Sequence, residues 1–175
     1  MQHNRSNGNK VKLIIAGGIV AVVVAGTLFI SGIKGNNSGN ANQSSKAAAQ
    51  ISENGDLVIP VKDITEKANF YAYKSEDGTK LEVLAVKASD GTIRTAFNTC
   101  QVCYSSGKGY YEMKGDILEC QNCGNRFSAD DVEVTRGGCN PVPITDEYKT
   151  VDEANITLSK DFLEKAKVIF ENWKS

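Results

Sequence analysis

The pattern of apolar and polar residues changes twice along the chain, and each part predicts a different kind of segment. From Val11 to Ile33 nearly every residue is apolar, and no charged residue stands between Lys12 and Lys34. About 20 apolar residues are enough for a helix to cross a bilayer. We therefore expect one N-terminal transmembrane helix over residues 13–33. A cleaved signal peptide is the alternative, but its apolar core is shorter and a small-residue cleavage site follows it.

After Ile51 the pattern becomes that of a β-rich domain. The runs NFYAYK, KLEVLAVK and TIRTAF are separated by segments with an Asp-Gly pair, which is typical of hairpin turns. The runs DLVIPV and ANITL predict two more strands. Pro60 favours an edge position for the first of them, because proline cannot donate a ladder hydrogen bond. The segment YYEMKGDILEC predicts a hairpin that turns at Gly115–Asp116.

The chain ends in a helical pattern. Ser159 can cap a helix, and Asp161 would lie in its first turn. An apolar stripe at helical spacing favours a helix that faces the core over a helix that binds a partner; it consists of Phe162, Ala166, Ile169, Phe170 and Trp173. The expected fold class is therefore mainly β with a C-terminal helix, an α+β fold.

Charge divides the chain at the same place as the hydrophobic pattern. Five basic and no acidic residues precede Ile51, whereas 15 basic and 21 acidic residues lie from there on. By the positive-inside rule, residues 1–12 form a cytoplasmic arm, and the C-terminal domain is extracytoplasmic on a single-pass protein of the cell membrane. Residues 34–50 are rich in Gly, Asn, Ser and Ala and predict a flexible linker, so residues 51–175 form the domain. No basic stripe with aromatics indicates a nucleic-acid partner.

The five cysteines carry the candidate chemistry. Cys100 and Cys103 form one C-x-x-C pair, Cys120 and Cys123 form a second, and sixteen residues separate the pairs. Two thiolates of one tight turn can reach the same ion, and a hairpin between the pairs brings them together, so this spacing predicts a metal site with four cysteine ligands. Cys139, in the segment GGCNP, is a fifth ligand, an exchange partner or a reactive thiol.

The rest of the composition narrows the kind of metal site. The only histidine is His3, which excludes from the C-terminal domain a Cys2His2 zinc site, a histidine-ligated haem and the two imidazole ligands of an ordinary Rieske cluster. Zinc and an iron–sulfur cluster both accept four thiolates, and the spacing does not decide between them. Two structural disulfides are a further alternative, but a disulfide framework usually has an even number of cysteines and this chain has five. Tyr104, Tyr110 and Tyr111 are expected to pack beside the site.

Residues 96–144 resemble the FtrD-like family of membrane iron–sulfur proteins. The motifs that carry the likeness are CxVCY, GKGY, a GD hairpin turn, CxNCGxRF and GGCNPxPI, and a weaker likeness extends back through FYAYKSEDGTKLEVLAVKASDGTIR. The resemblance implies an iron–sulfur cluster and a link to iron uptake, in which a metal permease works with redox partner proteins. It therefore implies electron transfer that supports uptake of iron or another metal.

A second resemblance concerns the fold of the metal subdomain, residues 96–144. The two ligand pairs and the proline-rich loop after them are similar to a Rieske domain with cysteines in place of the histidines. We expect a Rieske-like or zinc-ribbon-like hairpin subdomain on a β-sheet base. A redox carrier or binding protein is expected more than a classical enzyme. A zinc-stabilised, non-redox binding module stays open, because the N-terminal arm holds a lone Arg5 and not the Arg-Arg pair of the route that exports folded cofactor proteins. A thiol–disulfide or metal-handling protein that uses Cys139 with one C-x-x-C pair also stays open.

Overall fold

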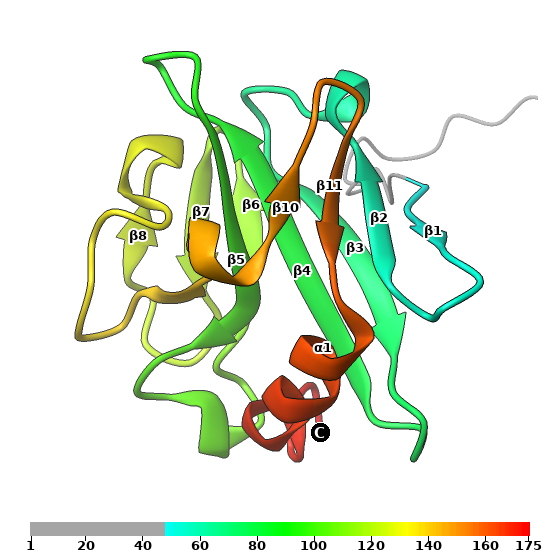
Figure 1. The fold of residues 1–175 in the computed structure, drawn as a ribbon. Coiled ribbons are helices and arrows are strands. Elements are labelled where there is room, and N and C mark those ends of the chain that lie inside the picture. Colours follow the sequence, from blue (N-terminus) through cyan, green and yellow to red (C-terminus); the bar gives the residue numbers. More distant parts are fainter. Residues whose placement is uncertain (1–47) are drawn as a thin grey trace, which may run out of the picture. The chain divides into compact units, whose positions relative to one another are not determined.

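The computed structural model describes residues 48–175, and its strands form three antiparallel sheets (Figure 1). The fold is mainly β with one C-terminal α-helix, as the sequence predicts. The transmembrane helix expected over residues 13–33 and the cytoplasmic arm of residues 1–12 lie outside the described part, as does almost all of the predicted linker. Within residues 48–175, no helix is long and apolar enough to cross a membrane.

The first sheet joins the beginning and the end of the described chain. Its strands, in spatial order, are β1 (Gln50–Ile51), β2 (Leu57–Pro60), β11 (Asn155–Leu158) and β10 (Thr150–Val151). The edge position expected for β2 is therefore wrong, because β1 and β11 flank it. However, β1 pairs only with Leu57 and Val58, so Pro60 has a partner on one side alone and its missing N–H leaves no gap in the ladder.

The second sheet lies in the middle and carries apolar residues on both faces. Its strands, in spatial order, are β3 (Asn69–Lys74), β4 (Lys80–Lys87), β5 (Ile93–Cys100) and β9 (Pro141–Pro143). The three long strands match the predicted runs. Tyr71 and Val83 point to one face and Phe70 and Leu84 to the other, and all four are buried. Burial on both faces explains why KLEVLAVK is almost continuously apolar instead of alternating.

The third sheet is the predicted cysteine hairpin with one short strand added. Strands β6 (Tyr111–Lys114) and β7 (Ile117–Cys120) are joined by Gly115–Asp116, as expected, and Gly115 has φ +69°. The additional strand β8 (Arg126–Phe127) pairs with β7. This sheet packs against the central sheet through Tyr111, Leu118 and Cys120, which are all buried.

Helix α1 (Lys160–Ala166) starts at Ser159, whose Oγ accepts a hydrogen bond from the N–H of Phe162 at 3.3 Å. The predicted cap and core-facing stripe are thus confirmed, since Phe170 is buried and the rest of the stripe packs against the same core. Short 3-10 helices complete the described part: η1 (Val61–Asp63), η2 (Tyr104–Ser106), η3 (Ala129–Asp131), η4 (Asp146–Tyr148) and η5 (Lys167–Phe170).

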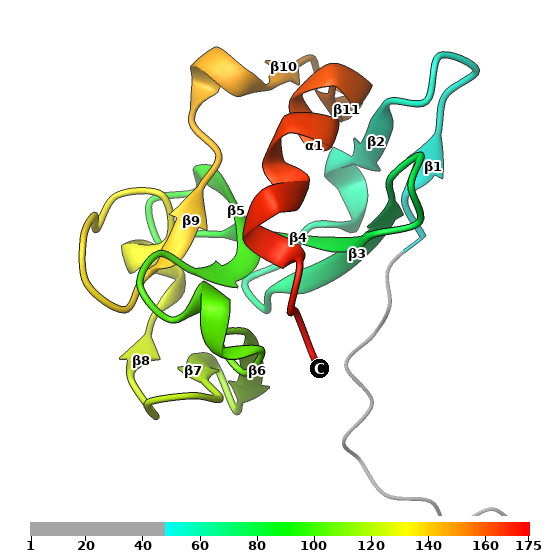
Figure 2. The ribbon, with the colours of Figure 1, turned by 90° about the horizontal axis from the view of Figure 1, so that it is seen from below.

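The three sheets form three layers, with a separate core on each side of the central sheet (Figure 2). The first core fills the space between the β1–β2–β11–β10 sheet, helix α1 and the central sheet. The second core fills the space between the central sheet and the cysteine hairpin, and it contains Cys100 and Cys120. These two cysteines are therefore part of the packing between the hairpin and the central sheet.

Candidate metal centre

The cysteines lie where strands end. Cys100 is the last residue of β5 and Cys120 the last residue of β7, while Cys103 and Cys123 lie in the turns that follow these strands. Cys139 lies in the loop that leads into β9, which is paired with β5. All five cysteines carry free thiols.

The two C-x-x-C segments form tight turns that hold their first sulfur near the backbone. Cys100 Sγ accepts hydrogen bonds from the N–H of Cys103 at 3.2 Å and of Val102 at 3.5 Å. In the second turn, the N–H of Gly124 bonds to the carbonyl of Cys120 at 2.8 Å, and Gly124 has the left-handed φ of +72° that favours glycine.

The structure brings all five sulfurs into one cluster, which we call the thiol cluster. The Sγ atoms of Cys100, Cys103, Cys120 and Cys139 all lie within 4.8 Å of one another. Cys139 Sγ is central, at 3.3 Å from Cys100 Sγ, 3.2 Å from Cys103 Sγ and 2.8 Å from Cys123 Sγ. The sequence grouped the two C-x-x-C pairs and left Cys139 open, whereas the structure places Cys139 at the contact between both pairs.

The donor set of the thiol cluster fits a thiophilic metal or an iron–sulfur group. Thiolate sulfur is the ligand that zinc and iron–sulfur centres share. Two sulfurs bound to one zinc ion at about 2.3 Å each can be at most about 4.6 Å apart, close to the 4.8 Å span of the set. Only small movements of the side chains would therefore bring four of these sulfurs around one ion.

Burial and hydrogen bonding give the thiols different acidities. Burial raises the pKa of the Cys100 thiol, but the N–H groups of Cys103 and Val102 donate to this sulfur and, with the Tyr111 and Cys139 side chains beside it, lower the pKa below its ordinary value. The bond from Cys139 lowers the pKa of the exposed Cys123 thiol. Burial raises the pKa of Cys120 to about 11.

The pKa of Cys139 is shifted in the opposite direction to those of Cys100 and Cys123. Its burial raises its pKa, and its hydrogen bonds to Cys123, Cys103 and Cys100 raise it further. The cluster thus contains two thiols with a lowered pKa, Cys100 and Cys123, and a central thiol with a raised pKa, Cys139. Since a metal binds thiolates, metal binding at this cluster releases protons and becomes weaker as the pH falls.

Polar residues around the thiol cluster hold the loop of Cys139. The hydroxyl of Tyr111 donates to the carbonyl of Cys139 at 2.6 Å, and the Tyr111 N–H donates to the side chain of buried Asn98 at 2.7 Å. Gln101 bridges the first turn to the same loop, since its N–H donates to the carbonyl of Asn140 at 3.0 Å and its side chain accepts from Gly137 at 3.2 Å. Tyr111 therefore packs, as expected, and also bonds to the site.

The sequence pattern did not single out these supporting residues. Asn98 and Gln101 look like ordinary polar residues of a strand end and a turn, and their role depends on partners far along the chain. One weak signal was available for Asn98, because an amide directly after the apolar pair Ala96–Phe97 in a predicted strand is expected to need a polar partner if it is buried. Tyr110 and Trp173 pack edge to face at 6.4 Å, while Tyr104 is exposed.

Comparison with known proteins gives one family. The family model described as "Membrane iron-sulfur containing protein FtrD-like" matches residues 38–170, which include all five cysteines and nearly the whole described part. No curated protein and no solved structure matches the chain.

Proposed function

The chain belongs to the FtrD-like family of membrane iron–sulfur-containing proteins, and on this premise we propose that it is a membrane-anchored electron carrier. In this proposal an iron–sulfur cluster is held by cysteine thiolates, and it supports the uptake of iron or another metal. The cluster would accept and return electrons, and the chain would hold it, shield it and present it to partners.

The observation that carries this proposal is the thiol cluster itself. Five cysteines from three separate loops meet within contact distance, and two of them, Cys100 and Cys120, are buried in the second core. Structural thiols scattered through a core have no reason to converge in this way. Sulfur ligands, a partly buried position and N–H groups that donate to sulfur are the features by which proteins hold and tune iron–sulfur clusters.

The layout supports a Rieske-like subdomain as the finer part of the proposal. Two cysteine turns, at the ends of β5 and β7, and a proline-rich loop before β9 surround the thiol cluster, and the hairpin rests on the central sheet. In this layout, cysteines would take the places where a Rieske centre has two histidines. We propose accordingly that its reduction potential is lower than that of a histidine-ligated centre.

The cellular setting is part of the same proposal. A single N-terminal span over residues 13–33 would fix the domain to the cell membrane, and the basic residues before it would keep residues 1–12 in the cytoplasm. The thiol cluster would then face outward, toward a metal permease or the redox proteins that serve it. The family's description supports the membrane location.

One observation favours a second candidate, a zinc clip that stabilises a non-redox binding module. The four mutually close sulfurs lie within 4.8 Å of one another, which is nearer to the roughly 3.8 Å between two sulfurs on one tetrahedral ion than to the wider separation of the ligands of a multinuclear cluster. Zinc would cross-link the hairpin to the central sheet but would carry no electrons.

Metal and sulfide analysis distinguishes these functions. We would purify the full chain in detergent without oxygen and measure iron, zinc, acid-labile sulfide and the visible spectrum per chain. Iron with sulfide and absorbance that bleaches reversibly with dithionite supports the electron carrier. One zinc per colourless chain contradicts it and supports the clip. A chain that binds neither iron nor zinc, and in which two thiols oxidise and reduce reversibly, is a thiol–disulfide protein instead.

Replacement of a buried cysteine tests whether the cluster holds metal. Cys120→Ser is expected to lose most of the bound metal and to lower the thermal unfolding midpoint, because metal binding of this kind is coupled to folding. Val102→Ala is a matched control, since this side chain lies within the first turn but is 62% exposed. A Cys120→Ser protein with the full metal content of the parent would remove Cys120 from the ligand set.

A further inference from the structure

The loop from Val132 to Asn140 carries Cys139, and the structure anchors it at both ends. At its C-terminal end, the loop continues into β9, which pairs with β5 and so with the strand that ends in Cys100. At its N-terminal end, Glu133 reaches back to the same strand. The Glu133 carboxylate accepts a hydrogen bond from the Thr95 N–H at 2.9 Å.

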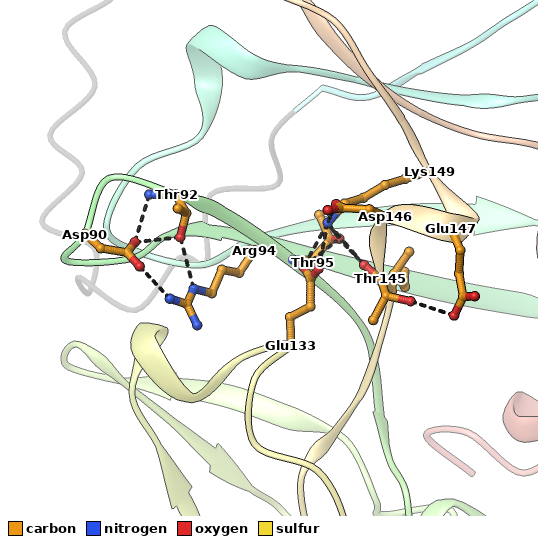
Figure 3. Close-up of polar contacts among 10 residues, drawn as sticks. Asp90, Thr92, Arg94, Thr95, Glu133, Thr145, Asp146, Glu147 and Lys149 are labelled. Carbon is orange, nitrogen blue, oxygen red and sulfur yellow. Dashed lines mark hydrogen bonds and ion pairs between the residues drawn. The ribbon is translucent and has the colours of Figure 1, made fainter.

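A buried ion pair fixes the Glu133 end, and we call it the Glu133–Lys149 clamp (Figure 3). Lys149 Nζ lies 2.8 Å and 3.0 Å from the two carboxylate oxygens of Glu133. It also donates to Thr95 Oγ1 at 3.1 Å and to the carbonyl of Ile144 at 3.2 Å. The Lys149 side chain is only 3% exposed, so the clamp is shielded from water and salt.

The backbone of the clamp is strained as well. Glu133 has a φ of +67°, a left-handed conformation that side chains other than glycine rarely adopt. Gly137 and Gly138 in the same loop have φ values of +82° and +65°. Such strain persists only where the surroundings determine the conformation, and it is concentrated at functional sites. The chain thus holds this loop in one arrangement, and that arrangement brings Cys139 into contact with three other sulfurs.

Cys123 differs from Cys139 in its exposure and in its place among the sulfurs. Its side chain is exposed, and its sulfur does not belong to the set of four that lie within 4.8 Å of one another. The residues around it, Asn122 and Gly124 to Arg126, are exposed too. Its sulfur lies 2.8 Å from Cys139 Sγ and also interacts with the Cys103 and Cys120 thiols, so it adjoins the set without belonging to it.

From these observations we infer that Cys139 and not Cys123 completes the four-thiolate set with Cys100, Cys103 and Cys120, and that the Glu133–Lys149 clamp positions it. Cys123 is then an outer thiol, next to the bound metal and open to solvent, through which the metal enters or leaves. This inference rests on the proposal that the thiols hold a metal centre, but it is independent of whether the metal is iron or zinc.

Alkylation of the unaltered protein tests the ligand set without any substitution. The full chain with its metal bound would be treated with iodoacetamide in detergent without oxygen, and the labelled cysteines would be identified by mass spectrometry over time. We expect Cys123 to react at least tenfold faster than the other four. Faster reaction of Cys139 than of Cys123, or equal protection of all five, would overturn the inference.

Paired substitutions give a second test with metal content as the readout. Cys123→Ser is expected to keep its metal, and Cys139→Ser to lose most of it. Retention by Cys139→Ser or loss from Cys123→Ser overturns the inference, whatever the metal is. The identity of the metal, in contrast, decides the proposed function. A wild-type chain in which all five thiols react at once has no metal centre, and this result would refute both.

Substitutions in the clamp test the positioning role. In Glu133→Gln we expect Cys139 of the metal-bound protein to become about tenfold more reactive, as loss of an outer partner weakens metal binding about 10–100-fold, while Cys100 stays protected. Lys149→Met should raise the reactivity of Cys139 in the same way. Lys149→Arg, which keeps the positive charge, should leave Cys139 as protected as it is in the parent protein. Asp146→Asn is the control, because Asp146 also pairs with Lys149 but is 93% exposed. Uniform exposure of all cysteines in Glu133→Gln would show general unfolding and refute the positioning role.

Discussion

Gly109 shows how closely single residues are fitted around the thiol cluster. A Cβ at this position would overlap the carbonyl group of Cys103, and the Gly109 carbonyl accepts the N–H of Cys100 at 2.6 Å. The absence of a side chain therefore lets this segment lie against the first cysteine turn. The sequence motif GKGY contains this glycine, but only the structure shows which backbone it approaches.

Gly109→Ala is expected to displace the first cysteine turn and to weaken metal binding about 10–100-fold, as loss of supporting contacts does at metal sites. Competition with a chromogenic chelator on the full chain measures this change. Ser105→Ala, in the same segment but exposed, serves as the control. Equal metal affinity in Gly109→Ala and the parent would mean that the turn yields without affecting the ligands.

Tyr111→Phe removes the hydroxyl that bonds to the Cys139 loop. Because this hydroxyl donates to the carbonyl of Cys139 at 2.6 Å, we expect the unfolding free energy to fall by about 1 kcal/mol. Chemical denaturation monitored by the fluorescence of Trp173 measures it. Tyr104→Phe, which alters an exposed tyrosine, should leave the unfolding free energy unchanged. A loss as large in Tyr104→Phe would show that the effect is not specific to this bond.

At the scale of elements, η3 supports the start of the Cys139 loop. The carboxylate of Asp131 accepts hydrogen bonds from the hydroxyl of Ser128 at 2.7 Å and from its N–H at 2.9 Å. These bonds lower the pKa of Asp131. A carboxyl group with a lowered pKa in the folded state stabilises the fold above its unfolded pKa of about 3.9, and this contribution disappears as the pH falls through the folded pKa.

Asp131→Asn is therefore expected to lower the unfolding free energy near pH 7 by at most about 1 kcal/mol, the size of an ordinary helix cap, and this deficit is expected to shrink toward the acid end of the range. Urea denaturation at a series of pH values from 7 down to 3 measures this difference. Asp130→Asn, whose carboxylate bonds only to exposed Ser89, is the matched control. A deficit that persists unchanged at the lowest pH would exclude an ionic contribution.

The sequence predicts the long elements of this fold and fails for the short ones. Strands β3, β4 and the β6–β7 hairpin follow from apolar runs and Asp-Gly or Gly-Asp turns, and the cap of α1 follows from Ser159. The two-residue strands β1, β8 and β10 have no pattern of their own, because neighbouring strands alone determine that they pair. The edge position predicted from Pro60 was wrong for the same reason. The two-residue strand β1 pairs only with Leu57 and Val58, so only the second half of β2, which contains Pro60, has a free edge.

For the site, the sequence predicts which residue type matters but not how its members are ranked. The spacing of the C-x-x-C pairs gives four equivalent cysteines, whereas burial and sulfur contacts place Cys139 inside and Cys123 outside. The sequence does not predict the Glu133–Lys149 clamp either, because two charged residues sixteen positions apart suggest a solvated surface. Long-range contacts decide both points, and no local pattern encodes them.

At the scale of the whole molecule, metal removal should affect the two cores unequally. The thiol cluster is continuous with the second core, while the first core and helix α1 lie on the other side of the central sheet. Extraction of the metal with a chelator, without oxygen, is thus expected to speed amide hydrogen exchange in β6–β8 at least tenfold. Exchange in β2 and β11 should change little. Uniform acceleration across both cores would indicate one cooperative unit instead.

The pairing of β2 with β11 has a consequence for how the protein is made. Strands from the two ends of the described chain form one sheet, and all five cysteines lie between them in sequence. A ribosome that adds about 5–20 residues per second needs about 1–4 s to proceed from Cys139 to Leu158. During this interval every thiol has been synthesised while the outer sheet still lacks its closing strand. The outer sheet is therefore completed only after the last cysteine has been made, so β2 waits for its partner strand while the whole cysteine-bearing segment is synthesised.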